Sequence, residues 1–93
     1  SHFKGQADFN AKYLFMIDGK EKSLFLDING TELDCRYSKE ENVDVYMKLS
    51  PSIMDSIVSG RETFQRAFSV GDMTAKGNFR TLRMLDELFT FTS

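Results

Sequence analysis

The fold of this 93-residue chain is decided by the stretch VDVYMKLSP, residues 43–51, in which the hydrophobic period changes. Apolar and polar residues alternate as far as Leu49, which is typical of a strand with one buried face. The inward set is Val43, Val45, Met47 and Leu49, and the outward set is Asp44, Tyr46 and Lys48. Ser50 can then cap a helix, and Pro51 suits the first helical position. The sequence therefore predicts a strand over 43–49 and a helix from Pro51.

Downstream of Pro51 the period is mainly helical. Ile53, Met54, Ile57 and Val58 form an apolar stripe, and Gly60 ends this helix as a left-handed cap. A second short helix is predicted over 62–69 and a fifth strand over 70–76. Asn78 then caps a final helix that runs from residue 79 to about residue 89. Its apolar stripe consists of Phe79, Leu82, Leu85, Leu88 and Phe89.

Upstream of residue 43 the chain reads as three further strands, over 11–18, 24–28 and 33–37. Asn29-Gly30 predicts a tight hairpin because both residues tolerate positive φ. Four consecutive strands with short turns predict an antiparallel meander, and the late helices should cover one face of it. The fold class is α+β, a five-stranded, mostly antiparallel sheet with about three helices. We expect residues 1–10 to be a loose lead-in, of which residues 1–2 could be the remnant of an expression tag. Residues 11–93 should form a single domain that was excised from a longer protein.

Composition narrows the function classes. The net charge of −2, with no basic run, argues against nucleic acid as a partner. No apolar run is long enough to span a bilayer, and no signal-peptide pattern is present. Cys35 is the only cysteine and His2 the only histidine, which predicts no disulfide, no metal site, no cofactor and no catalytic residue. We expect a cytoplasmic protein that is not an enzyme, with Cys35 as a buried, inert thiol.

Three stretches together resemble the sterol carrier protein type two family. Residues 44–50 resemble its alternating strand and Ser-capped helix, and residues 57–61 its helix end, where Gly is followed by a basic residue. Residues 67–78 resemble a family segment in which Ala-Phe is followed by a small residue, a Gly, an alternating strand and a second Gly. A helix that ends in Leu88-Phe89 follows. The resemblance covers residues 11–89. It implies an apolar tunnel between sheet and helices that serves to bind, or to bind and transfer, a fatty acid, fatty acyl-coenzyme A or a sterol-like lipid.

Inward positions of the strands and helices supply the candidate binding residues. A plain core explains each of them on the pattern alone, and the resemblance places about half of them on a cavity wall. The candidates are Met47, Leu49, Ile53, Ile57, Phe64, Phe68, Met73, Leu82, Leu85 and Phe89.

The N-terminal segment differs from the family pattern. Only ten residues precede Ala11, too few for the helix with which family domains usually begin. The apolar surface left uncovered can be hidden in two ways: the final helix and Phe91 fold across it, or it packs against a partner. We favour a homodimer or a neighbouring domain, with Phe3, Phe9 and Phe91 free to pack against the partner. A second hypothesis is therefore open, namely a non-catalytic accessory or dimerisation domain of a larger multidomain enzyme.

Overall fold

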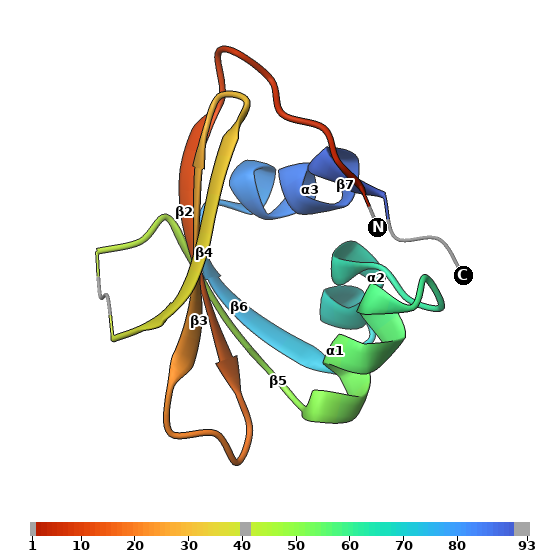
Figure 1. Cartoon of the computed structure of the whole chain (residues 1–93). Coiled ribbons are helices and arrows are strands. Elements are labelled where there is room, and N and C mark those ends of the chain that lie inside the picture. The colour runs from red at the N-terminus through yellow and green to blue at the C-terminus, as the bar shows by residue number, and fades with distance from the viewer. Residues whose placement is uncertain (1, 40–41, 91–93) are drawn as a thin grey trace.

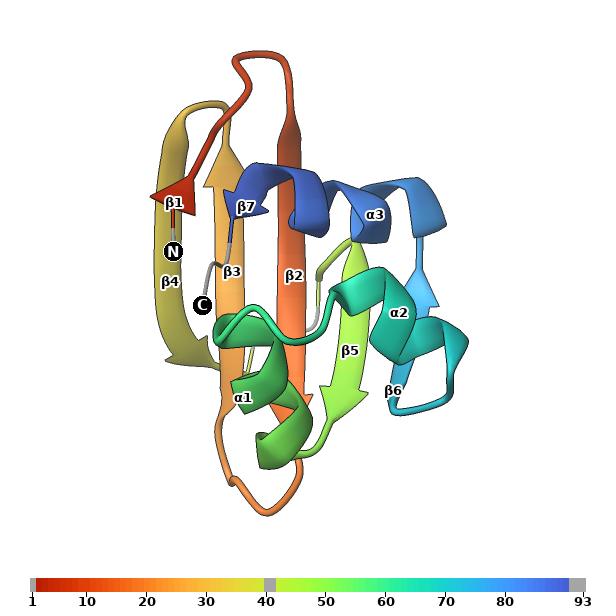
Figure 2. The ribbon, with the colours of Figure 1, turned by 90° about the vertical axis from the view of Figure 1, so that its right-hand side faces the viewer.

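The structure, a computed structural model, describes residues 2–39 and 42–90 and confirms the α+β class (Figure 1). Its strands are β1 (His2–Phe3), β2 (Asn10–Ile17), β3 (Ser23–Asn29), β4 (Glu32–Ser38), β5 (Val45–Leu49), β6 (Met73–Gly77) and β7 (Phe89–Thr90). Its helices are α1 (Pro51–Val58), α2 (Phe64–Ser69) and α3 (Phe79–Leu88). All three helices lie over one face of the sheet (Figure 2).

The strand order of the main sheet is β4-β3-β2-β5-β6. The pair β2–β5 is parallel, with Leu14 opposite Tyr46, and the other pairs are antiparallel. The predicted four-stranded meander is therefore wrong, because β5 does not pair with β4. The chain leaves β4 at the edge of the sheet and returns to the centre, as a parallel pairing requires.

The sheet face away from the helices carries a small apolar cluster of its own. Leu14 and Phe25 are opposite each other in the β2–β3 register and are 5% and 1% exposed. The Arg36 guanidinium lies 4.7 Å from the centre of the Phe25 ring. The described ends of the crossover between β4 and β5 lie on this same side in Figure 1. The middle of the sheet is therefore buried on both faces, under the helices on one side and at Leu14 and Phe25 on the other.

The capping residues in the sequence predicted the start of α1 and α3 and the end of α1 correctly. Ser50 Oγ accepts a hydrogen bond from the Ile53 amide at 3.2 Å, and Asn78 Oδ1 accepts from the Arg80 amide at 2.9 Å. Gly60 follows α1 with φ +83°, as predicted. The second helix begins later than predicted, at Phe64, because Thr63 Oγ1 provides its cap. The fifth strand begins at Met73 because residues 70–72 form a turn.

The main core lies between the sheet and the helices. Val45, Met47 and Leu49 face it from β5 and are at most 2% exposed, which confirms the predicted alternation for these three residues. Val43 was predicted to belong to the same inward set, but the strand begins only at Val45 and Val43 is half-buried before it. Tyr13 crosses this layer, and its hydroxyl donates to the Thr81 carbonyl on α3 at 2.7 Å. Burial, and to a lesser extent the charge of Asp44, raises the pKa of Tyr13. The neutral phenol therefore ties the first helical turn of α3 to the central strand.

The lead-in is not loose. β1 pairs with β7, and the Lys4 amide donates to the Leu88 carbonyl at 2.6 Å. Phe3 packs on the ring of Phe89 with the ring centres 5.1 Å apart. The segment is thus held against the end of α3, on the helix side of the sheet (Figure 1).

Candidate functional site

A small apolar cavity of about 160 Å³ lies between the sheet and the helices. Residues from four strands and from all three helices line it, so the cavity exists only when the whole domain is folded. Its lining comes from β2, β3, β4, α1, α2, α3 and β7. The lining residues are Phe15, Leu24, Leu26, Cys35, Met54, Val58, Phe64, Leu85 and Phe89.

The lining is hydrocarbon except for two sulfur atoms. Met54 carries a thioether, and Cys35 is the one titratable side chain among the nine residues. Burial, and then the charge of Asp34, raises the pKa of the Cys35 thiol. Such a wall offers no strong hydrogen-bond donor or charge to a ligand, so it favours apolar chains over polar molecules.

The cavity opens at the β4 edge of the sheet. In the β3–β4 register, Cys35 is opposite the buried Leu26, so its side chain faces the helix layer. It is nevertheless exposed, and so are its face neighbours Leu33 and Tyr37. Val58 of α1, 47% exposed, also lines the cavity. The prediction that Cys35 is buried is wrong because alternation fixes the face of a strand but not whether anything covers it.

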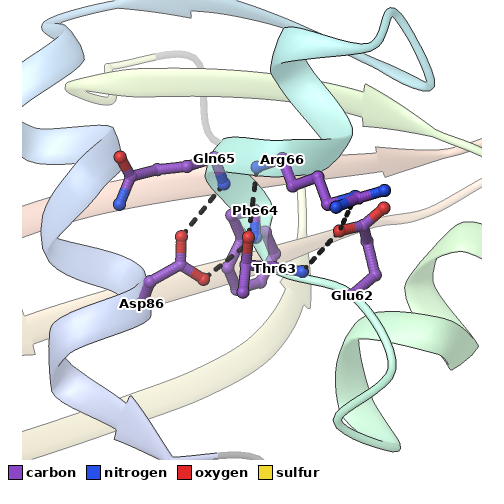
Figure 3. Close-up of polar contacts among 6 residues, drawn as sticks. All are labelled: Glu62, Thr63, Phe64, Gln65, Arg66 and Asp86. Atoms are coloured by element: carbon purple, nitrogen blue, oxygen red, sulfur yellow. Dashed lines mark hydrogen bonds and ion pairs between the residues drawn. The ribbon is translucent and has the colours of Figure 1, made fainter.

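The inner wall of the cavity is held by a carboxylate from α3. Asp86 Oδ1 accepts a hydrogen bond from the Phe64 amide at 2.9 Å, and Oδ2 accepts from the Gln65 amide at 3.0 Å (Figure 3). These amides are at the start of α2 and have no partner within that helix. Asp86 thereby fixes α2 to α3 and holds Phe64, whose ring centre lies 5.6 Å from that of Phe15. Sequence analysis missed Asp86, because its two partners are more than twenty residues away along the chain.

We expect Asp86→Ala to lower the free energy of unfolding by about 2 kcal/mol, because two amides at the start of α2 lose their acceptor. Urea denaturation followed by circular dichroism measures the change. The matched control is Glu87→Ala, which removes an exposed carboxylate from the adjacent position of the same helix and should change stability by less than about 0.5 kcal/mol. Equal losses in the two variants would contradict the assignment.

The structure divides the ten candidate binding residues into two groups. Phe64, Leu85 and Phe89 line the cavity. Met47, Leu49, Ile57, Met73 and Leu82 are buried in the surrounding core, and Ile53 and Phe68 are partly buried against it. Sequence analysis did not single out the remaining lining residues, which are Phe15, Leu24, Leu26, Cys35, Met54 and Val58.

Two expectations about phenylalanines on the surface need correction. Phe3 and Phe9 were expected to be free for a partner, but both are partly buried and pack against the core of this chain. Phe91 lies outside the described residues. Phe79 was placed in the apolar stripe of the last helix, yet it is 58% exposed and contacts Phe68 at the surface, with the ring centres 5.3 Å apart.

The family model of the SCP-2 sterol transfer family matches residues 5–90. No curated protein matches the chain in sequence. Among solved structures, sterol carrier protein 2 from Yarrowia lipolytica, in its apo form, is similar with a TM-score of 0.70 and 24% identity, covering 84% of this chain and 65% of that one. The palmitated SCP2L2 of Aedes aegypti is similar with a TM-score of 0.68 and 16% identity, covering 85% and 71%.

A third similar structure belongs to a much larger protein. The stereoselective inverting sec-alkylsulfatase Pisa1 from Pseudomonas sp. gives a TM-score of 0.75 at 19% identity. The match covers 90% of this chain but 13% of the sulfatase. At these identities the structural matches establish the fold alone. In the part of the chain that the structure describes, no helix is long and apolar enough to cross a membrane.

Proposed function

We propose that this chain, which belongs to the SCP-2 sterol transfer family, binds the acyl chain of a fatty acid or fatty acyl compound in the cavity between sheet and helices. The observation that carries the proposal is the lining, in which all nine side chains are apolar except for one thiol. Burial of a methylene group in such a site is worth about 0.8 kcal/mol. Several carbons held there account for useful affinity without any polar contact.

The size and the opening of the cavity favour a flexible chain over a rigid sterol. A cavity of about 150 Å³ holds one benzene-sized molecule, and this one measures about 160 Å³. A rigid sterol nucleus of four fused rings is larger than that volume and would have to protrude from the opening. An acyl chain can place its terminal carbons inside and leave through the opening beside Cys35 and Val58, with its carboxyl end in water. We infer that the domain binds the tail of its ligand and leaves the head group outside.

We infer binding without chemistry at this site. A nucleophilic cysteine needs an accessible thiolate, and the raised pKa of Cys35 lowers the thiolate fraction at neutral pH. None of the nine described residues that line the cavity is a base that could activate the thiol.

Cys35→Trp tests the proposal, because the indole would occupy the opening from a position that tolerates exposure. We expect a fluorescent medium-chain fatty acid to bind wild-type protein saturably and to bind the variant at least about tenfold more weakly. Cys35→Ser, which adds no bulk, should retain binding. Val70→Trp places the same indole on a surface 56% exposed and away from the cavity, and should also retain it.

Thermal unfolding of all four proteins separates blockage from misfolding, since the exposed positions should change the midpoint by only a few degrees. Equal affinities for Cys35→Trp and wild type would refute this site. If no fatty acid or sterol bound the wild-type protein at all, the second candidate function, a non-catalytic accessory domain, would be favoured. That candidate is supported by the similar domain within the much larger sulfatase and by the uncovered inner face of β4.

A further inference from the structure

A second concavity lies on the β2-β5-β6 part of the sheet and shares no residue with the acyl cavity. Its volume is about 520 Å³, and it is lined by Met16, Tyr46, Lys48, Thr74, Ala75 and Lys76. Tyr46 and Lys48 alternate with the core-facing residues of β5, so they project to the face away from the helices. In Figure 1 this is the face on the side of the sheet opposite α1, α2 and α3. A ligand here would not compete with one in the acyl cavity.

The strand register brings two lysines to this one hollow. Tyr46 is opposite Lys76, and Lys48 is opposite Thr74. Lys48 and Lys76 are therefore diagonal neighbours on adjacent strands, about 7–8 Å apart at the backbone and within joint reach of one ligand. Met16 and Tyr46, both partly buried, provide an apolar floor beside the two ammonium groups.

Neither lysine forms an ion pair with any carboxylate in the described ranges 2–39 and 42–90. None of the six residues that line the hollow is an acid. Of the described acids, Asp34 pairs with Arg36, and the carboxylate of Asp44 accepts a hydrogen bond from the Lys12 amide. An adjoining hollow shares Met16 and Lys48 and adds Lys20 together with one carboxylate, that of Asp18. The residues that line the two hollows thus include three lysines and one carboxylate, although the whole chain carries a net charge of −2.

We propose that this concavity binds an anionic amphiphile. Lys48 and Lys76 hold its phosphate, sulfate or carboxylate group, and the first carbons of its chain rest on Met16 and Tyr46. An anion between the two ammonium groups replaces their mutual repulsion with two charge-assisted hydrogen bonds. The hollow shape suits a head group with a short apolar stem better than it suits a flat polymer surface. This inference goes beyond the acyl-binding function and does not depend on it.

Hexyl phosphate is the probe, because its short chain keeps it monomeric. We expect it to shift the amide resonances of residues 46, 48, 74 and 76, and to bind more tightly than methyl phosphate, which lacks the apolar stem. Lys48→Gln together with Lys76→Gln should weaken binding about tenfold. The matched control, Lys4→Gln together with Lys22→Gln, makes the same change in net charge at two exposed residues outside the hollow and should leave binding unchanged.

A second arm identifies the source of the head group. Phosphatidylcholine vesicles with and without phosphatidylserine are tested with the same variants. Binding of hexyl phosphate that depends on Lys48 and Lys76 supports a dispersed ligand, and binding to anionic vesicles alone that depends on them supports a lipid within a bilayer. Equal affinities in the two double variants, or shifts confined to residues 54, 64 and 85 of the acyl cavity, would overturn the proposal.

Discussion

Replacing Gly77 with alanine is expected to lower the free energy of unfolding by roughly 3–5 kcal/mol, a large part of the total for a domain of this size. Two costs add. Gly77 has φ +129°, a conformation that residues with a side chain rarely adopt. An added Cβ would also lie 2.1 Å from the Asp44 carbonyl oxygen and 3.0 Å from the Val45 Cα. Both obstacles are backbone atoms, so no change of rotamer can relieve the overlap.

Gly71→Ala is the matched control for this loss. Gly71 also has a positive φ, +85°, but an added Cβ there meets no atom within 4 Å. We expect a loss of about 1 kcal/mol, from the backbone conformation alone. Urea denaturation of both variants isolates the cost of the close contact. Similar losses at the two positions would show that the β5–β6 junction can move apart without penalty.

The large loss of stability expected for Gly77→Ala follows from the three elements that come together at this residue. Asp44 ends the crossover, and its amide donates to the Lys12 carbonyl at 2.8 Å while its carboxylate accepts from the Lys12 amide at 2.8 Å. Gly77 ends β6, and Asn78 at once caps α3. The central strand, the crossover and the last helix are therefore joined through one close backbone contact that only glycine permits.

The sequence predicted the elements better than their order in the sheet. Periodicity and capping are local signals, so the strand at residues 45–49 and the helix starts at Pro51 and Phe79 were found nearly to the residue. Which strands pair is decided by contacts distant in sequence. One signal was present: residues 13–17 are continuously apolar, whereas residues 43–49 alternate. A continuous run is typical of a strand covered on both faces, as β2 is at Leu14.

The cavity was less predictable than the fold. Every inward residue of a strand or helix is apolar, whether it packs against protein or lines a space. Seven of the ten candidates do not line the cavity for that reason: five are buried in the core and two are partly buried against it. Cys35 and Val58 line the cavity because the β4 edge is uncovered. The role of Asp86 could not be predicted for a related reason. A carboxylate on a helix usually indicates a surface position, and only the packing of α2 against α3 shows that it caps another helix.

Leu85→Ala joins the stability of the fold to the proposed ligand. Leu85 is fully buried on α3 and lines the acyl cavity. Its truncation is expected to lower the free energy of unfolding by about 2–5 kcal/mol, as for other buried leucines. The space that it vacates extends the existing cavity by the volume of about three carbons. If that cavity holds an acyl chain, the variant should bind the chain more tightly, by about 0.8 kcal/mol for each additional methylene that is buried.

Leu82→Ala distinguishes this outcome from a general loosening of α3. Leu82 is equally buried, on the same helix and one turn earlier, but it does not line the acyl cavity. We expect the same loss of stability and no gain in affinity. Calorimetric titration with decanoic acid measures the affinity, and thermal unfolding with and without saturating decanoic acid measures the stability. Since a ligand at a hundred times its Kd stabilises the folded state by about 2.7 kcal/mol, a tighter complex should recover more of the loss in Leu85→Ala than in Leu82→Ala. Identical affinities in the two variants would place the acyl chain elsewhere, because only one of them enlarges the space proposed to hold it.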